Sequence, residues 1–479
     1  MTMFIFLLLS PFILPLCAAT ETTASLRFVA DTISHDSRAG FHKSSTSPGI
    51  ITTVAGGGSE TNGVAATSRI IDSPQDLAFD KEGNFYIAAY YDHRIYKVTA
   101  SGIITTVAGT GSQSYGGDGG QATSAILNCP AGIVFDTTGD IFIADSGNGR
   151  IRKITMSTGL ITTVAGDGKK DAGKDNIAAT SSTLLMPSDV AVDPYGNIFI
   201  AETTTARIRK VTASTGIITT IAGSDIKGIS AVATKYYLYR PTGVTLDTAG
   251  NVYFAGGGDP CIFKITVSTG GISIVAGTGS FLSGGKLDYN VDDILATEAN
   301  LKYPNKVVFD ASGNMYISDS GNRRIRKVTA STGIITTVAG TGEVTSSDSN
   351  PKDGEGGLAT AASISYPTGV AIDSSGNLYF ADDKFGVVRK VTFNGATPSI
   401  SATSPPSVKG TPSSPSAPVA STPTASAPTP GASSSSSKAP TAPSSTATQS
   451  SSTTHFVQTL HLTIILLISV LILHFCRDA

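Results

Sequence analysis

The chain has 479 residues and a formal net charge of −2, with 34 Lys and Arg residues against 36 Asp and Glu residues. A nucleic-acid-binding protein needs a basic face for the phosphates, and no such excess exists here, so RNA and DNA are excluded as expected partners. Four cysteines are present: Cys17 and Cys476 lie in the terminal apolar segments, and Cys129 and Cys261 lie in different repeats, so no disulfide is implied.

The first 19 residues form an apolar run, MTMFIFLLLSPFILPLCAA, which Pro11 and Pro15 interrupt. Its shortness and its prolines favour a secretory signal peptide cleaved near Ala19 over a membrane span, although it has no basic residue near its start. An N-terminal anchor is the alternative. Residues 20–48 are polar and without pattern, so we expect a poorly ordered leader there.

The segment Pro130 to Gly166 has the pattern of four short strands joined by tight turns. The expected strands are Gly132–Phe135, Ile141–Ala144, Arg150–Ile154 and Leu160–Ala165. They are rich in β-branched residues, and the first and last turns contain Gly139 and Gly159, as hairpins require. Four antiparallel strands of this length predict one blade-sized sheet.

The same unit recurs six times, at intervals of 54 to 63 residues. Each copy opens with a proline, followed six residues later by an aspartate and then by a glycine with Asn or Asp. The prolines are Pro74, Pro130, Pro187, Pro241, Pro304 and Pro367, and the aspartates are Asp80, Asp136, Asp193, Asp247, Asp310 and Asp373. Repeats of this length indicate a propeller or a solenoid. Because these residues occur in every copy, we interpret them as structural requirements of the blade.

The two ends of the array complement each other. The last copy stops at Lys390-Val-Thr392 without a fourth strand, whereas Ile51 to Gly56 stands alone before the first copy. Pairing of the N-terminal strand with Val387–Val391 would close a ring and remove its open edges. We therefore predict an all-β, six-bladed β-propeller over residues 49–393.

The copies resemble NHL repeats. The resemblance is carried by Ala144–Ile151 (ADSGNGRI), Ser318–Ile325 (SDSGNRRI) and the joint that runs from Gly116–Gly120 (GGDGG) to Pro130–Gly132 (PAG). It implies the fold, and it leaves the activity open, because such propellers occur in extracellular receptor and adhesion-type domains, in RNA- and protein-binding cytosolic proteins and in a peptide-amidating lyase.

Strand order predicts two unlike faces on the ring. With strands a to d in each blade, the a–b and c–d turns lie on one face, and the b–c turns and the d–a joints lie on the other, which we call the joint face. The joint face carries the residues that differ between copies, so we place candidate ligand-binding residues there. They are Tyr90, Tyr91, Asp92, His93, Tyr115, Asp118, Tyr236, Tyr237, Tyr239 and Asp259. In the alternative interpretation, the tyrosines at positions 236, 237 and 239 only cap the blade stack.

Repeated arginines and acids admit a structural interpretation. The repeated basic residues are expected to pair with acids such as Asp145, Glu202 and Asp319 at the other end of the same turn. They are Arg150, Arg152 and Lys153 with their equivalents Arg207, Arg209, Lys210, Arg324, Arg326 and Lys327. An enzyme site of the lyase type would need several histidines, and the propeller has only His93. We expect no cofactor. Calcium at the ring mouth is the alternative, and its candidate ligands are Asp118, Asp259, Asp292 and Asp353.

Beyond the propeller, residues 394–454 are almost entirely Ser, Thr, Pro and Ala, which predicts an extended low-complexity stalk with O-linked sugars. Residues 455–479 contain a terminal apolar run. Small residues before a polar spacer favour a GPI-attachment signal, with Ser450 and Ser451 as candidate sites, and a transmembrane tail is the alternative.

Together these features predict a protein of the secretory pathway that is held on the extracellular side of the plasma membrane by its C-terminal tail. We interpret it as a monomeric binding module that displays an NHL-type propeller on a mucin-like stalk, with an extracellular protein or glycan as its ligand. The alternative is an extracellular propeller enzyme of the lactonase or lyase type, which a central cluster of three or more acids or histidines would favour.

Overall fold

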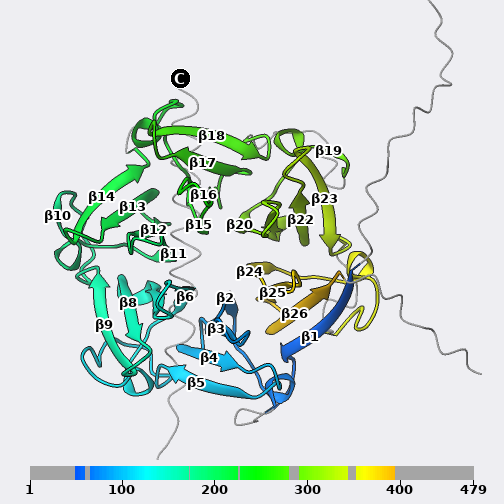
Figure 1. The fold of residues 1–479 in the computed structure, drawn as a ribbon, viewed down its shortest axis with the longest axis horizontal. Coiled ribbons are helices and arrows are strands. Elements are labelled where there is room, and N and C mark those ends of the chain that lie inside the picture. Colours follow the sequence, from blue (N-terminus) through cyan, green and yellow to red (C-terminus); the bar gives the residue numbers. More distant parts are fainter. Residues whose placement is uncertain are drawn as a thin grey trace, which may run out of the picture. The chain divides into compact units, whose positions relative to one another are not determined.

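The computed structural model describes residues 49–59, 65–171, 173–224, 227–279, 291–343 and 352–393. Within these ranges the chain forms β-strands and short 3₁₀ turns, and the strands make six antiparallel sheets arranged as the blades of a ring (Figure 1). The predicted signal peptide, leader, stalk and C-terminal tail, with Ser450 and Ser451, lie outside the described residues. No helix within the described ranges has the length and apolarity needed to cross a membrane.

Each blade is a meander whose first strand lies nearest the ring centre (Figure 1). Blade 1 comprises β2 (Pro74–Phe79), β3 (Phe85–Ala89), β4 (Arg94–Val98) and β5 (Ile104–Ala108), and blade 2 comprises β6 (Pro130–Phe135), β7 (Ile141–Asp145), β8 (Arg150–Thr155) and β9 (Leu160–Ala165). Blade 3 comprises β11 (Pro187–Val192), β12 (Ile198–Glu202), β13 (Arg207–Thr212) and β14 (Ile217–Ala222), and blade 4 comprises β15 (Val244–Leu246), β16 (Val252–Ala255), β17 (Ile262–Thr266) and β18 (Gly271–Ala276). Blade 5 comprises β20 (Pro304–Phe309), β21 (Met315–Asp319), β22 (Arg324–Val328) and β23 (Ile334–Ala339).

Blade 6 is completed by the N-terminal strand, as predicted. It contains β24 (Pro367–Ile372), β25 (Leu378–Asp382) and β26 (Val387–Thr392), and its outer strand is β1 (Ile50–Gly56). The antiparallel register runs from Ile50 opposite Thr392 to Gly56 opposite Val387. Residues more than 330 positions apart in the chain therefore share one sheet, and the ring is closed by backbone hydrogen bonds.

The repeated aspartate holds the turn between the first two strands of each blade. In blade 1, Asp80 Oδ1 accepts a hydrogen bond from the backbone N–H of Asn84 at 2.8 Å, and Asp80 Oδ2 accepts one from the Asn84 side chain at 2.8 Å. The same pair of bonds links Asp193 with Asn197 and Asp310 with Asn314. A side chain that satisfies the backbone of its own turn is needed once per blade, which confirms the structural interpretation of this aspartate.

The joints between blades share one structural element although their sequences and lengths differ. Each contains a 3₁₀ turn that begins with an Ala-Thr pair. In blades 1 to 5 this turn lies against the c–d turn of the following blade, as where the Ala122 N–H donates to Gly159 O at 2.8 Å, and in blade 6 the Ala359 N–H donates to Gly49 O at 2.8 Å. These turns are η1 (Ala66–Ser68), η2 (Ala122–Ser124), η4 (Ala179–Ser181), η5 (Ala233–Lys235), η6 (Ala296–Glu298) and η8 (Ala359–Ala361), and η3 (Ser146–Asn148) and η7 (Ser320–Asn322) lie in b–c turns. In blades 3 and 5 the joint also adds a fifth outer strand, β10 (Ile177–Ala178) or β19 (Ile294–Leu295), where the sequence predicted four.

The hydrophobic core is divided among the spaces between neighbouring blades. Between blades 6 and 1, for example, Tyr379 packs with Phe79 and Phe85, and the rings of Tyr379 and Phe79 meet edge-on at a centroid distance of 4.8 Å. Such packing fixes each blade against the next, so the inner ends of the six blades are held in a rigid ring around the channel.

Candidate functional site

The inner strands bring one residue of every blade to the channel at the same height. This residue lies two positions after the opening proline, and around the ring it alternates between a charged residue and glycine. The sequence of residues is Asp76, Gly132, Asp189, Gly243, Lys306 and Gly369. The three charged residues therefore come from blades 1, 3 and 5, and their side chains meet across the channel.

These three residues form a buried ionic cluster, which we call the channel triad. Lys306 Nζ donates to Asp76 Oδ2 at 2.9 Å and to Asp189 Oδ2 at 2.6 Å. Each carboxylate also accepts a backbone N–H of the following blade, from Ile133 at 3.0 Å and from Val244 at 2.7 Å. The triad therefore links five of the six blades, with one ammonium group between two carboxylates.

The glycines of the alternating position make room for the triad. A Cβ atom at Gly132 would lie 2.5 Å from Asp189 Oδ1, and one at Gly369 would lie 2.8 Å from Asp76 Oδ1. Both Oδ1 atoms are buried and have no hydrogen-bond partner among the described residues. Burial raises the pKa of Asp189 to about 7, against the opposing effect of Lys306, and the two carboxylates raise the pKa of the Lys306 ammonium despite its burial. The triad thus has more acceptors than donors.

A cavity of about 310 Å³ opens above the triad on the joint face. We call it the mouth cavity. Its walls include Gln75, Ser188, Thr242 and Asn305, the residues that follow the opening proline in four blades. The two hydroxyl groups hold the ring together, because Ser188 Oγ donates to Thr242 O at 2.9 Å and Thr242 Oγ1 donates to Asn305 O at 2.9 Å. The cavity is therefore polar and is built on rigid strand ends.

The residues that precede the six opening prolines lie on the joint face, and three of them, Ser73, Met186 and Arg240, line the cavity. We call this set the pre-proline rim: Ser73, Cys129, Met186, Arg240, Tyr303 and Tyr366. All except Tyr366 have a positive φ, between 46° and 56°. Ser73 and Cys129 are buried, whereas Met186, Arg240, Tyr303 and Tyr366, from four consecutive blades, are exposed.

The b–c turn of blade 1 supplies the next group of predicted residues. Tyr90 and Tyr91 line the mouth cavity, their rings meet edge-on at 5.0 Å, and burial raises the pKa of Tyr90 to about 12. Asp92 instead accepts from the Tyr96 hydroxyl at 3.0 Å. His93 is buried, and its Nδ1 accepts the Cys129 N–H at 3.0 Å, which agrees with the pKa of His93 being lowered by burial. Only the two tyrosines of this turn face the cavity.

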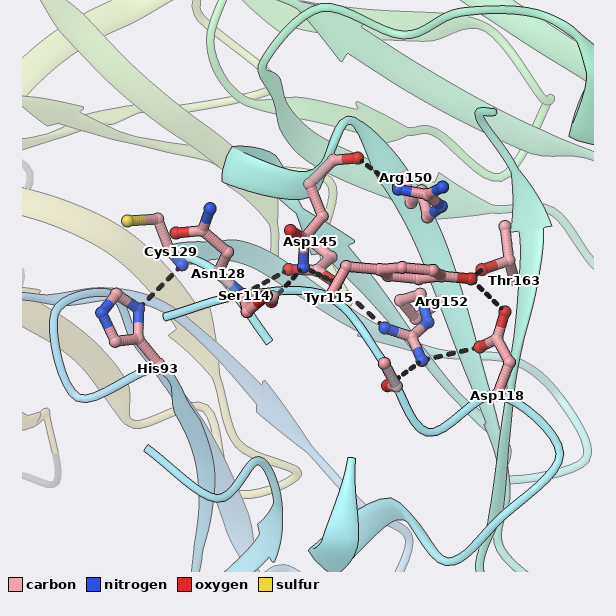
Figure 2. Close-up of polar contacts among 12 residues, drawn as sticks. His93, Ser114, Tyr115, Asp118, Asn128, Cys129, Asp145, Arg150, Arg152 and Thr163 are labelled. Atoms are coloured by element: carbon pink, nitrogen blue, oxygen red, sulfur yellow. Dashed lines mark hydrogen bonds and ion pairs between the residues drawn. The ribbon is translucent and has the colours of Figure 1, made fainter. Parts of the chain in front are cut away.

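Tyr115 and Asp118 belong to an ionic network outside the cavity (Figure 2). Arg152 is fully buried and contacts Asp145 at 3.2 Å and Asp118 at 2.6 Å. The Tyr115 hydroxyl donates to Asp118 at 2.7 Å, and the Arg150 guanidinium lies 3.7 Å from the centroid of the Tyr115 ring. Asp118 comes from a d–a joint and Arg152 from strand β8, so the network ties the joint to blade 2. We call this arrangement the arginine clamp.

The arginine clamp recurs in four blades. Arg209 pairs with Glu202 at 2.9 Å and Asp175 at 2.8 Å, and Arg326 pairs with Asp319 at 3.5 Å and Asp292 at 2.9 Å. Arg389 of blade 6 has Glu355 at 3.8 Å. The predicted pairing with Asp145, Glu202 and Asp319 is confirmed for Arg152, Arg209 and Arg326. Arg150 instead donates to Asn148 O and Asp167 O, and Lys153 pairs with Asp136 and Asp140. In blade 1, Tyr96 stands at the arginine position and Ala89 at the acid position, so both members of the pair are replaced there.

The remaining predicted residues lie around blade 4. Tyr236 is half-buried against Phe263, at a centroid distance of 5.3 Å, and the backbone N–H of Tyr237 donates to Gly228 O at 3.0 Å. Tyr239 is exposed, and its N–H donates to Asp259 Oδ2 at 2.9 Å. Burial raises the pKa of Asp259 to about 6. Binding by these residues stays a prediction; the structure does not bring them together with Tyr90 and Tyr91.

The described residues contain no group of three or more His, Cys, Asp or Glu side chains placed to hold a metal ion. The four calcium candidates lie apart: Asp118 and Asp292 bind clamp arginines, Asp259 binds Tyr239 N–H, and Asp353 accepts the Ser363 N–H at 3.2 Å. The channel joins two acids with a lysine, and a third acid, Asp383 of blade 6, lines the mouth of the same channel and accepts a hydrogen bond from Ser73 Oγ.

The sequence interpretation missed the channel triad. Its signal was available, because Asp76, Asp189 and Lys306 stand at one fixed position of a repeat in which the other copies have glycine. A charge on the inner strand at the position where alternate blades have no side chain indicates a group that crosses the channel. Lys306 and Arg240 were also absent from the predicted site residues, because the prediction concentrated on the variable turns and joints. Each of these two residues instead occupies a fixed position of the repeat.

Comparison with known proteins agrees with this architecture. The family described as NHL repeat matches residues 127–154. A chloroplastic Arabidopsis thaliana protein, SUPPRESSOR OF QUENCHING 1, is 25% identical over 299 residues, covering 61% of this chain and 27% of that protein. Teneurin-1 of Gallus gallus is 30% identical over 282 residues, covering 51% of this chain and 10% of its own length. The chain thus spans about a quarter or less of the length of these curated relatives.

Solved structures show the same fold. An auxiliary nutrient binding protein from Bacteroides ovatus has a TM-score of 0.50 at 20% identity, covering 72% of this chain and 77% of that chain. A Bacteroides thetaiotaomicron protein of unknown function has a TM-score of 0.52 at 17% identity, covering 72% and 75%. With the match at residues 127–154 and six copies of the same unit in a closed ring, the predicted resemblance to NHL-repeat propellers is confirmed.

Proposed function

We propose that this chain is an extracellular binding module, tethered to the membrane by its C-terminal tail, whose propeller receives a protein or glycan at the mouth cavity. The observation that carries the proposal is the pre-proline rim. Five of its six residues have a positive φ, and none of them is glycine. Glycine would adopt this backbone conformation without strain, so the side chains found there must have a role that outweighs the strain.

The strain at the rim has a definable size. A left-handed conformation costs a non-glycine residue about 1–2 kcal/mol, and it is disfavoured further before proline. Elsewhere in the described chain, glycine takes most of the positive-φ positions. Asn and Asp tolerate this conformation best, but the rim has Ser, Cys, Met, Arg and Tyr. Backbone preference therefore does not explain which residues occupy the rim, and a role of their side chains does.

The exposed part of the rim has the composition of a recognition surface. Met186 is 49% exposed, Tyr303 is 48% exposed and Tyr366 is 36% exposed, and Arg240 lies among them. Tyr, Arg and Met are the residue types that interfaces favour, and Tyr91 adds a 62% exposed ring across the cavity. Exposed side chains contribute little to the stability of the ring, so binding is the function that best accounts for them.

Tethering and location rest on the terminal segments of the sequence. The proposed signal peptide (1–19), stalk (394–454) and tail (455–479) describe an exported protein held at the cell surface, with GPI attachment at Ser450 or Ser451 favoured over a spanning helix. Binding of extracellular partners agrees with the similarity to teneurin-1 and with the fold of a nutrient binding protein. The Arabidopsis relative is a chloroplastic protein by its name, so the fold alone does not set the location.

Glycine substitution at the rim tests the proposal, because it removes side chains and relieves strain together. Cells displaying the full chain would be probed with a glycan array and a panel of labelled ectodomains, for the wild type and for Met186→Gly, Arg240→Gly and Tyr303→Gly combined. We expect at least one probe to bind the wild type and the variant to lose that binding at least tenfold, with an unchanged or higher melting temperature.

Asn176→Gly is the matched control, since Asn176 is exposed with a φ of 61° but lies in a joint away from the cavity. It should leave binding unchanged. Equal binding by the wild type and the rim variant, or the absence of any bound probe, would refute the proposed function.

A further inference from the structure

The mouth cavity has two electrostatically different ends. At its buried end, the channel triad combines one ammonium with two carboxylates, so its net charge is negative. Asp76 and Asp189, 2% and 3% exposed, each keep one oxygen without a partner among the described residues. A buried carboxylate oxygen without a donor is costly, so this end favours a ligand or solvent molecule that brings O–H or N–H groups.

Lys306 adds one donor at the same end. Its ammonium group has three N–H bonds, and two of them are used by Asp76 and Asp189. A ligand group that both accepts a hydrogen bond from Lys306 and donates one to a carboxylate oxygen would satisfy the polar atoms at this buried end of the cavity, which we call the floor. A hydroxyl group does both. A second ammonium group would be repelled by Lys306, and a carboxylate would be repelled by the net negative triad.

The outer part of the cavity carries one cation, Arg240, and one acid, Asp383. Arg240 is exposed, lines the cavity, and has no hydrogen bond or ion pair among the residues that the structure describes. Tyr366 lies close enough for an electrostatic interaction with both Arg240 and Asp383, and Asp383 lines the same cavity, where it accepts a hydrogen bond from Ser73 Oγ. A guanidinium group whose donors are unused is a ready partner for a carboxylate, which it can bind with two parallel hydrogen bonds.

The size of the cavity limits what can enter. Its volume of about 310 Å³ is at the lower end of the range for small-molecule sites, ~300–1,000 Å³. It can hold one sugar-sized group, and it cannot admit a folded element of a partner. Tyr90 and Tyr91 line one side, so an aromatic wall is available to a sugar ring.

We infer that the mouth cavity binds the acidic end sugar of a glycan, with hydroxyl groups against the channel triad and the sugar carboxylate on Arg240. This inference rests on the proposed binding function and chooses the glycan among its ligands. An acidic peptide side chain could pair with Arg240, but it brings no hydroxyl donors to Asp76 and Asp189. A neutral sugar could occupy the floor, but it leaves Arg240 unpaired. An acidic sugar satisfies both ends.

Glucuronic acid and glucose are a suitable pair of probes, because they differ only at C6, which is a carboxylate in the first sugar and a hydroxymethyl group in the second. Isothermal titration calorimetry on the purified full-length protein should show glucuronic acid binding about tenfold more tightly than glucose. Arg240→Gln should abolish this preference, so that both sugars bind about equally. Lys235→Gln, which removes an exposed positive charge from η5 of the same blade, should keep it.

A second variant tests the floor. Asp76→Asn replaces one carboxylate by an amide of the same shape, and it should weaken glucuronic acid and glucose by the same factor, leaving their ratio at about ten. Equal affinity of the two sugars for the wild type, a preference that survives Arg240→Gln, or no sugar binding would overturn the inference. Binding of an acidic hexapeptide such as Glu₆ with no sugar binding would overturn it as well, while the proposed binding function would stand if the rim glycine variant lost that peptide.

Discussion

Removing one member of an arginine clamp should be far more harmful than removing the pair. Arg152 and Asp145 are both fully buried and lie 3.2 Å apart. Arg152→Tyr would leave the Asp145 carboxylate without its cation, held only by the Asn128 N–H and the Asn148 amide, both at 2.8 Å. An uncompensated buried charge costs about 3–5 kcal/mol, and we expect a loss of that size in the free energy of unfolding.

Blade 1 supplies the matched replacement, because it has Ala89 and Tyr96 where blade 2 has the ion pair. The double variant Asp145→Ala with Arg152→Tyr should lose only about 2 kcal/mol, mainly from the Asn128 N–H left without its acceptor and from imperfect packing. Asp145→Ala alone should cost about 3 kcal/mol, since Arg152 keeps Gly116 O at 3.2 Å and a single carboxylate, that of Asp118, which is 32% exposed.

The assay is urea denaturation of the purified full-length protein at neutral pH, for the wild type, both single variants and the double variant. The coupling energy between positions 145 and 152 should exceed about 2 kcal/mol and be favourable in the double variant. Losses that simply add, to within about 0.5 kcal/mol, would show that the two residues act independently and would refute the reasoning.

Four further predictions follow from the ring and its termini. Deleting residues up to Gly57 removes the outer strand of blade 6 and should strongly lower the melting temperature, whereas an unchanged transition would rule out this closure. Lys306→Met leaves Asp76 and Asp189 facing each other without a cation, so unfolding should occur at lower urea concentration, and a variant as stable as the wild type would contradict the triad. Burial raises the pKa of Asp145 to about 6, and the equivalent acids of blades 5 and 6 behave alike, so the folded state binds more protons than the unfolded state between about pH 4 and pH 6, and the melting temperature should rise as the pH falls from about 7 to 5; a steady decrease would contradict it. A GPI-specific phospholipase should release the protein from cells, and retention after complete digestion would favour a spanning tail.

The match between repeat and fold explains why the fold was predictable. Hairpin turns need glycine and aspartate at fixed places, and strands need apolar residues in alternation. Each of the six copies therefore carries the same local signals for the same strands and turns. Asp80 and its equivalents show this directly, because each aspartate accepts a hydrogen bond from the backbone N–H of the residue four positions later in the same turn. Closure of the ring could also be predicted from the sequence, since the last copy lacks a fourth strand and one extra strand precedes the first copy.

The joints were harder to interpret from sequence. Their lengths and compositions differ, which predicted variable loops, yet each folds an Ala-Thr 3₁₀ turn against the next blade. Two of the candidate ligand-binding residues, Tyr115 and Asp118, lie in such a joint, and the structure engages both in a clamp around Arg152. A tyrosine or aspartate in a loop has the same appearance in sequence whether it faces solvent or satisfies a buried arginine.

The sequence by itself determined the blade, the number of blades, the closing strand and the joint face, because these follow from local turn chemistry and from repetition. Only the tertiary structure decided which residues share the channel. Asp76, Asp189 and Lys306 are separated by 113 and 117 positions, and they meet because ring closure places alternate blades across one axis. The positive φ of Arg240 and its lack of a partner among the described residues likewise depend on how the blades are packed. Contacts between distant blades leave no local pattern, so the mouth cavity and its charges appear only once the ring is formed.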